Sequence, residues 1–64
     1  MNQRRAEYRV DVFDAHHGFI KFDAKKNQDD AERIADVTAK SRKRWFRVVH
    51  RGQTIAEYDF RKKT

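Results

Sequence analysis

Hydrophobic and polar residues alternate in the first part of the chain. Over residues 8–14, every second position up to Val12 is aromatic or β-branched, and this period of two predicts a half-buried β-strand. A second strand is expected to begin at Phe19, after a three-residue loop that ends in Gly18, where a glycine suits the left-handed conformation. The register of this loop pairs Ala15 with Phe19, Val12 with Phe22 and Val10 with Ala24, and it places Val10, Val12, Phe22 and Ala24 on one face.

The middle of the chain has the period of an amphipathic helix. Asn27 is a suitable N-cap, and Asp29 and Asp30 stand where the positive end of the helix dipole favours acidic side chains. We expect the helix to run from about Gln28 to Ser41. Its apolar stripe contains mostly small side chains: Ala31, Ile34, Ala35, Val37 and Thr38.

The last third of the chain repeats the pattern of the first. Two alternating segments, residues 44–49 and 53–60, flank a loop that ends in Gly52. A second hairpin with a three-residue loop is therefore expected. Its register pairs Val48 with Thr54 and Phe46 with Ala56, and it places Phe46, Val48, Ala56, Tyr58 and Phe60 on one face.

These elements predict an α+β fold of the order ββαββ, in which one helix packs on a small four-stranded, mainly antiparallel sheet. We expect a single domain over residues 7–60, between a basic tail at residues 1–6 and another at residues 61–64. The predicted core between the helix and the sheet consists of Val10, Val12, Ile34, Phe46, Val48 and Tyr58.

Composition excludes several classes of function. The chain has 64 residues and no cysteine, so it has no disulfide framework and no thiolate zinc site. No apolar run approaches the roughly 18 residues of a membrane span, and no signal peptide opens the chain. We therefore expect a cytoplasmic protein that does not contact membranes. Its one serine, Ser41, has no orienting His–Asp arrangement and no glycine-rich phosphate loop is present, so we predict no enzymatic activity and no cofactor.

The net charge of +6 is concentrated in the second half of the chain. Residues 37–64 contain nine lysines and arginines against two acids, Glu57 and Asp59. Such asymmetry indicates a polyanionic partner. If the strands alternate in direction, the end of the helix, the end of the chain and the first hairpin turn lie together. That end then gathers Arg42, Lys43, Arg44, Arg61, Lys62 and Lys63. Either it binds phosphate groups, or it combines a basic tail with cations that complement the helix dipole.

The predicted registers also place apolar residues on the sheet face away from the helix. Phe13, Phe19 and Trp45 share it with Val49 and Ile55, interleaved with Arg9, Lys21 and Arg47. Nucleic acid is one explanation, because aromatic rings stack on bases while arginines bind phosphates. A second is another protein chain that covers this face, either another copy in a homodimer or a different partner. A third is simple partial exposure of these side chains.

The three histidines do not predict a metal site. His16 and His17 occupy the first hairpin turn and His50 the second, and these turns lie at opposite ends of the predicted fold. We interpret all three as exposed turn residues. The carboxylates on the strands, including Asp11, are interpreted as members of solvated strand faces.

The stretch from Tyr8 to Lys40, a hairpin followed by a helix, resembles the arm-type DNA-binding domains of tyrosine integrases. The resemblance implies a sheet laid against DNA, and the second hairpin departs from that pattern. Our hypothesis is a small non-enzymatic nucleic-acid-binding protein with weak sequence specificity. Its DNA or RNA contacts are predicted at Arg42, Lys43, Arg44, Arg47, Arg61, Lys62 and Lys63, and its aromatic face at Phe13, Phe19 and Trp45. The alternative is a protein-interaction module, such as a phage- or plasmid-type regulator or inhibitor, that docks on a partner or dimerises through the aromatic face.

Overall fold

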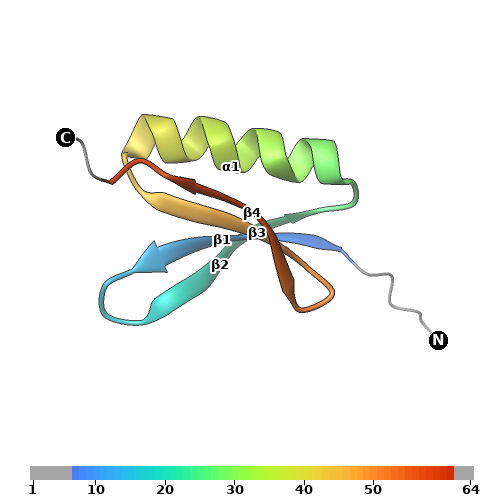
Figure 1. The fold of residues 1–64 in the computed structure, drawn as a ribbon, viewed down its shortest axis with the longest axis horizontal. Coiled ribbons are helices and arrows are strands. Elements are labelled where there is room, and N and C mark those ends of the chain that lie inside the picture. Colours follow the sequence, from blue (N-terminus) through green and yellow to red (C-terminus); the bar gives the residue numbers. More distant parts are fainter. Residues whose placement is uncertain (1–6, 62–64) are drawn as a thin grey trace.

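A computed structural model of the chain describes residues 7–61. The elements follow in the order β1 (Tyr8–Asp14), β2 (Gly18–Lys25), α1 (Gln28–Arg42), β3 (Trp45–His50) and β4 (Gln53–Asp59). The strands form one sheet in the order β2-β1-β3-β4, and every neighbouring pair is antiparallel. The predicted ββαββ architecture is confirmed, and the two hairpins join along β1 and β3 (Figure 1).

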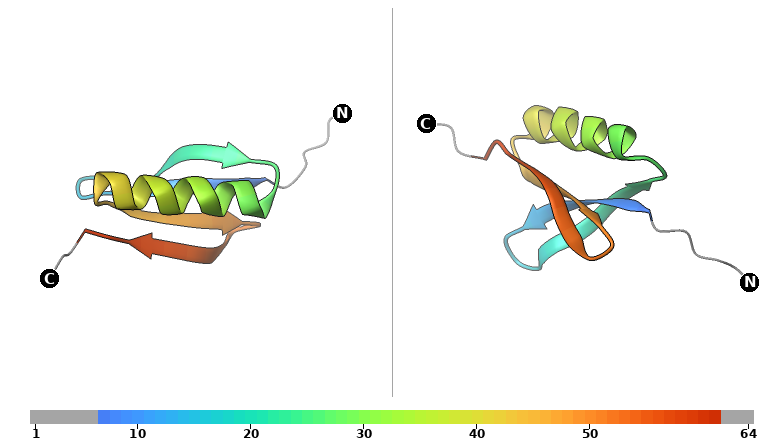
Figure 2. Two further views of the ribbon diagram at one scale, coloured as in Figure 1. Left: turned by 90° about the horizontal axis from the view of Figure 1, so that it is seen from above. Right: turned by 45° about the vertical axis from the view of Figure 1, so that its right-hand side comes forward.

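Helix α1 covers one face of the sheet. Seen from above, it runs over the two central strands, with β2 and β4 on either side (Figure 2). The helix buries Ala31, Ala35 and Ala39, which stand four residues apart and therefore form one stripe. Their small side chains allow α1 to pack closely on the sheet, where the buried side chains are Val10, Val12, Phe46 and Val48.

The predicted core is confirmed: its four residues on β1 and β3 are buried, and the other two are partly buried against it. Ile34 and Tyr58 are half-buried and pack against the edge of the core. The stripe of alanines, rather than Ile34, occupies the centre of the helix–sheet contact because it lies directly over the central strands.

Both ends of α1 are capped as local chemistry requires. The side chain of Asn27 accepts a hydrogen bond of 2.9 Å from the backbone N–H of Asp30, which confirms the predicted N-cap. At the other end Lys43 adopts a left-handed conformation with φ of 56°, and its N–H donates to the carbonyl of Ala39. The helix therefore ends at Arg42, one residue beyond the prediction.

The predicted register of the first hairpin is wrong. Asp14 pairs with Gly18 and Val12 with Ile20, because the N–H of His17 donates to the carbonyl of Asp14 and closes a turn one residue earlier than expected. Gly18 is left-handed as predicted, with φ of 80°. A bulge then makes Phe22 an extra residue, since Asp11 pairs with Lys21 and Val10 with Asp23. Phe22 thus contacts Phe46 on the helix side, whereas Ala24 pairs with Arg9 and lies on the other face.

The predicted register of the second hairpin is also wrong. The loop contains two residues, Arg51 and Gly52, with φ of 54° and 77°, and two successive positive φ angles are the mark of a type I′ turn. Val48 pairs with Ala56 and Phe46 with Tyr58. A bulge makes Ile55 the extra residue and restores the predicted helix-side face, on which Ala56, Tyr58 and Phe60 pack against the core.

The ends of the elements are arranged as the alternating strand directions predict. The end of α1, the end of β4 and the β1–β2 turn lie on one side of the molecule, and the β3–β4 turn lies on the opposite side (Figure 1). Within residues 7–61, no helix has the length and apolar character needed to cross a membrane.

Candidate nucleic-acid interface

The sheet face away from α1, here called the open face, is organised in cross-strand rows. Side chains alternate between the two faces of a strand, and the pairing of the strands aligns those on the open face. The aromatic row consists of Phe19, Phe13 and Trp45; the charged row of Lys21, Asp11, Arg47 and Glu57; and the third row of Ala24, Arg9, Val49 and Thr54. The residues predicted for this face on β1, β2 and β3 thus lie together.

The aromatic row is a compact cluster. The ring of Phe13 lies 5.4 Å from that of Phe19 and 5.1 Å from that of Trp45, and Phe19 lies 4.8 Å from Trp45. These distances and the tilted or T-shaped angles are those that aromatic pairs favour. The indole N–H of Trp45 donates to Glu57 at 3.3 Å. All three rings are half-buried, so the contacts within the chain already account for apolar side chains on this face.

Two arginines lie over rings of this aromatic cluster, and a third binds the backbone beside it. The guanidinium of Arg47 lies 3.8 Å from the centroid of Phe19, and that of Arg61 lies 4.4 Å from Trp45 and 5.5 Å from Phe13. Arg44 donates a hydrogen bond of 3.1 Å to the carbonyl of Phe13. The cluster is therefore bordered by cations that come from the residue before β3, from β3 itself and from the residues after β4.

Arg61 is fixed over the cluster by Asp59. Its Nε and Nη2 atoms each lie 2.9 Å from an oxygen of that carboxylate. The hydrogen bond to Asp59 is the main cause that raises the pKa of Arg61 above its ordinary value. Lys62 and Lys63, predicted for the same end, lie outside the described residues.

The basic triplet at the end of α1 does not act as one unit. Arg42 lies over the ring of Phe22, 5.5 Å from its centroid, and therefore belongs to the helix side of the sheet. Arg44 instead donates to the backbone carbonyl of Phe13 near the end of β1, and Lys43 is exposed at the C-cap between them. The structure thus places Arg47 and Arg61 over the aromatic cluster and Arg44 on its backbone, and it directs Arg42 to the other face.

Asp11 is a residue whose place the sequence did not predict. Its interpretation as a solvated carboxylate is wrong, because it is only 2% exposed. Arg9 donates to its two oxygens at 2.9 and 3.2 Å, and Nε of Arg47 lies 3.4 Å from it. A carboxylate two residues after an arginine on a strand was the available signal, but Arg47 joins it only through the pairing of β1 with β3.

Comparisons with protein-family models, with curated proteins and with solved structures find no match for this chain.

The histidines are placed at opposite ends, as expected. At the first turn, His17 lies 2.5 Å from Asp14, and this hydrogen bond is the main cause that lowers the pKa of the Asp14 carboxyl. The interpretation of His50 as an exposed turn residue is wrong, because it ends β3, is half-buried and stacks on Tyr8 at 3.8 Å. Among residues 7–61, no group of three or more His, Cys, Asp or Glu side chains could hold a metal ion.

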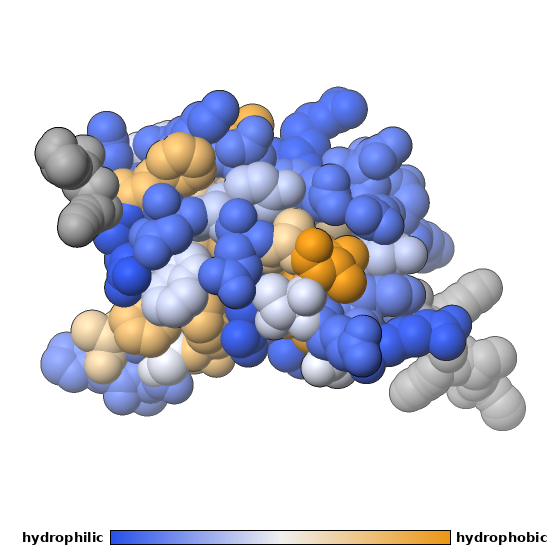
Figure 3. All heavy atoms as spheres, viewed as in Figure 1, coloured by the Kyte–Doolittle hydropathy of each residue, from blue (hydrophilic) through white to orange (hydrophobic). Residues whose placement is uncertain are grey.

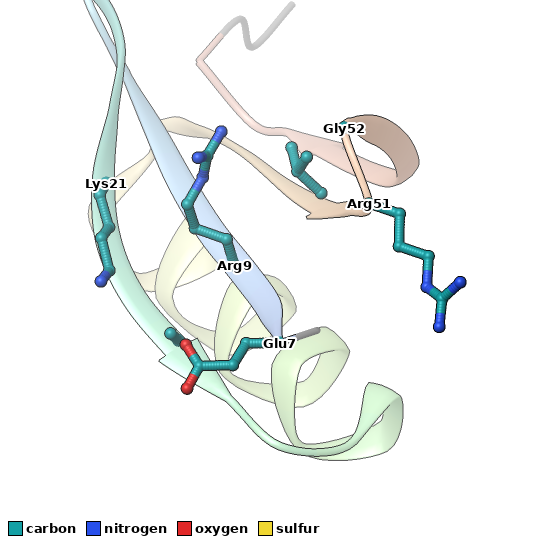
Figure 4. A pocket seen from close by; sticks show the side chains of 7 residues that line it. Glu7, Arg9, Lys21, Arg51 and Gly52 are labelled. Carbon is teal, nitrogen blue, oxygen red and sulfur yellow. The ribbon is translucent and has the colours of Figure 1, made fainter. Parts of the chain in front are cut away.

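The third row of the open face borders a shallow pocket of about 210 Å³. Arg9 and Lys21 reach it from neighbouring strands, and Arg51 comes from the β3–β4 turn but extends away from them (Figure 4). Elsewhere on the surface, in the view of Figure 3, hydrophobic residues form separate patches between hydrophilic ones. We therefore take the aromatic and charged rows of the open face, with the arginines around them, as the candidate binding site.

Proposed function

We propose that the protein is a small, non-enzymatic nucleic-acid-binding protein that contacts phosphate groups with weak sequence specificity. The observation that supports this most directly is that Arg47 and Arg61 lie over the rings of one aromatic cluster, while Arg44 binds the backbone carbonyl of Phe13 beside it. A guanidinium that lies on a ring keeps N–H groups at its edge, and its planar fork matches the oxygens of a phosphate.

The charge around this cluster supports a polyanionic partner. The chain has a net charge of +6, and exposed Arg42, Lys43 and Arg44 lie at the same end of the fold. Two nearby acids already have partners: Asp14 is hydrogen-bonded to His17, and Asp59 is in an ion pair with Arg61. Binding phosphates there would release counterions and depend steeply on salt.

Weak specificity follows from the type of contact. Guanidinium–phosphate and ring–base contacts are available to every sequence, because each nucleotide has the same backbone and each base has a π-face.

The experiment is a salt titration of affinity. Fluorescence anisotropy with a labelled random-sequence oligonucleotide compares the parent with the variant Arg42→Gln, Lys43→Gln, Arg44→Gln. The control variant removes three cations near the opposite end of α1: Lys25→Gln, Lys26→Gln, Arg33→Gln. We expect the first variant to bind more weakly and to flatten the slope of log K against log salt by about 0.7–0.9 for each phosphate group that is no longer neutralised.

The control should keep the parent's slope. Equal slopes in both variants would contradict the placement of the phosphate contacts. A parent that does not bind at about 50 mM salt would contradict the proposed function and favour the protein-interaction alternative.

A further inference from the structure

The open face contains a buried carboxylate that two arginines share. Burying a charged group is costly unless it is paired and hydrogen-bonded, and Asp11 meets this condition through Arg9 and Arg47. In Figure 4 the guanidinium of Arg9 is directed away from Glu7, which agrees with its hydrogen bonds to Asp11. One carboxylate thus pairs with two guanidinium groups, so the cluster of Arg9, Asp11 and Arg47 has a net charge of +1.

Both arginines remain accessible from solvent. The side chain of Arg9 is 48% exposed and that of Arg47 is 28% exposed. A mobile arginine side chain loses much rotamer freedom when it binds a ligand. Asp11 already orders these two side chains, so binding costs them less entropy. Two like charges held close together repel each other, and an anion that bridges them would relieve this repulsion. Lys21, which pairs with Asp11 across β1 and β2, adds an exposed cation beside them.

We propose that Arg9 and Arg47, positioned by Asp11, bind one phosphate of a single-stranded nucleic acid whose bases stack on the aromatic row. This inference rests on the proposed function and names its substrate class.

The position of the two arginines favours a single strand over a duplex. Neighbouring rows on one face are two residues apart along a strand, which corresponds to about 7 Å. A nucleotide bound at the charged row can therefore reach the aromatic row with its base, and Arg47 already contacts Phe19 in that row. Only unpaired bases offer a free face for stacking on protein rings.

Charge on the open face also fixes where the strand would lie. Glu57 lies on the side formed by β4, whereas Lys21, Arg9 and Arg47 lie on β2, β1 and β3. A polyanion is repelled by Glu57 and attracted to the three cations. We therefore place the single-stranded nucleic acid over β2, β1 and β3, away from β4.

The test compares the affinities of single-stranded and duplex DNA of the same random sequence at one salt concentration. The variant Arg9→Gln should weaken single-strand binding about tenfold, as expected for the loss of hydrogen bonds to a charged group, and should change duplex binding less than twofold. Arg9→Lys keeps the positive charge but not the planar guanidinium group, and its single-strand affinity should lie between those of Arg9→Gln and the parent. The control Arg33→Gln removes an exposed helix cation and should leave both affinities within twofold.

A second variant separates the arginine pair from net charge and from folding. Arg9→Gln with Asp11→Asn leaves the local charge at +1, as in the parent, and leaves no buried carboxylate with a missing partner. It should lose single-strand affinity as Arg9→Gln does. Parent-like affinity in this double variant, or equal losses in Arg9→Gln and Arg33→Gln, would overturn the inference while leaving the proposed function intact. A parent that binds neither form of DNA would overturn both.

Discussion

The guanidinium of Arg61 lies 4.4 Å from the centroid of the Trp45 ring. Trp45 begins β3 and Arg61 follows β4, so the end of the described chain covers the aromatic cluster that the open face displays. Asp59 holds the arginine there through two hydrogen bonds. The cluster is therefore covered in part by the chain's own cations, and a second copy of the chain is not needed to account for it.

Removing Arg61 should uncover Trp45. In the variant Arg61→Ala we expect the tryptophan emission to shift to longer wavelength and its quenching by acrylamide to increase, because the ring loses its stacked guanidinium. Arg33→Ala, an exposed helix position, should change neither quantity. Identical quenching in the parent and in Arg61→Ala would show that Arg61 does not cover the ring in solution.

The alanine stripe of α1 sets how closely the helix approaches the sheet. Ala35 is fully buried, so Ala35→Leu forces extra volume into the contact and should lower the free energy of unfolding by about 1–3 kcal/mol. Val37, 59% exposed on the same helix, provides the matched control, and Val37→Leu should change stability by less than about 0.5 kcal/mol. Urea unfolding measures both. Equal stabilities of the two variants would contradict the helix orientation.

Tyr58 predicts a loss of stability at alkaline pH. Burial is the main cause that raises the pKa of Tyr58, and the negative charges of Glu32 and Asp36 raise it further. The folded state therefore favours the neutral phenol, which adds to the free energy of unfolding. This contribution is complete below the ordinary tyrosine pKa of about 10 and is lost as the pH rises through the raised pKa. Above about pH 10, the Tm of the parent should fall more steeply than that of Tyr58→Phe. Parallel Tm curves for the two proteins would contradict the shift.

The layout of the fold follows from patterns that act locally. Alternation around Val10 and Val12 defines a strand with one buried face, and Asn27 defines the start of the helix through its own hydrogen bond. The same alternation places Phe13 and Trp45 on the face opposite the core. These features need no knowledge of the partner strand, and all of them were predictable from the sequence.

The registers were not predictable because they depend on turn conformations that the sequence does not fix. Arg51 adopts a positive φ, which is uncommon for residues other than glycine, and this shortens the second loop. A shift of one residue would move every later side chain to the other face. The bulge at Ile55 compensates for such a one-residue shift, so the predicted helix-side face of the second hairpin is retained. In the first hairpin the pairing next to the turn differs from the prediction by two residues, which leaves the faces unchanged, and the bulge at Phe22 then moves Ala24 to the other face.

The centre of the candidate site depended on strand order. Asp11 is buried because β1 pairs with β3 and brings Arg47 beside it. Without that pairing, an alternating run of charged residues on a strand indicates only a solvated face. The strand directions predict that Arg44 and Arg61 lie at one end of the fold, but not that Arg61 lies over Phe13 and Trp45 or that Arg44 binds the carbonyl of Phe13.

Trp45 provides the most direct measurement of the central claim, because it is the chain's single tryptophan and lies within the aromatic row. Its fluorescence is followed while an unlabelled single-stranded oligonucleotide is added at about 50 mM salt, up to about 100 μM, the weak end of non-specific binding. We predict a saturable quenching that is reversed when the salt concentration is raised. Emission that stays constant throughout this titration would contradict the proposal that the open face binds nucleic acid.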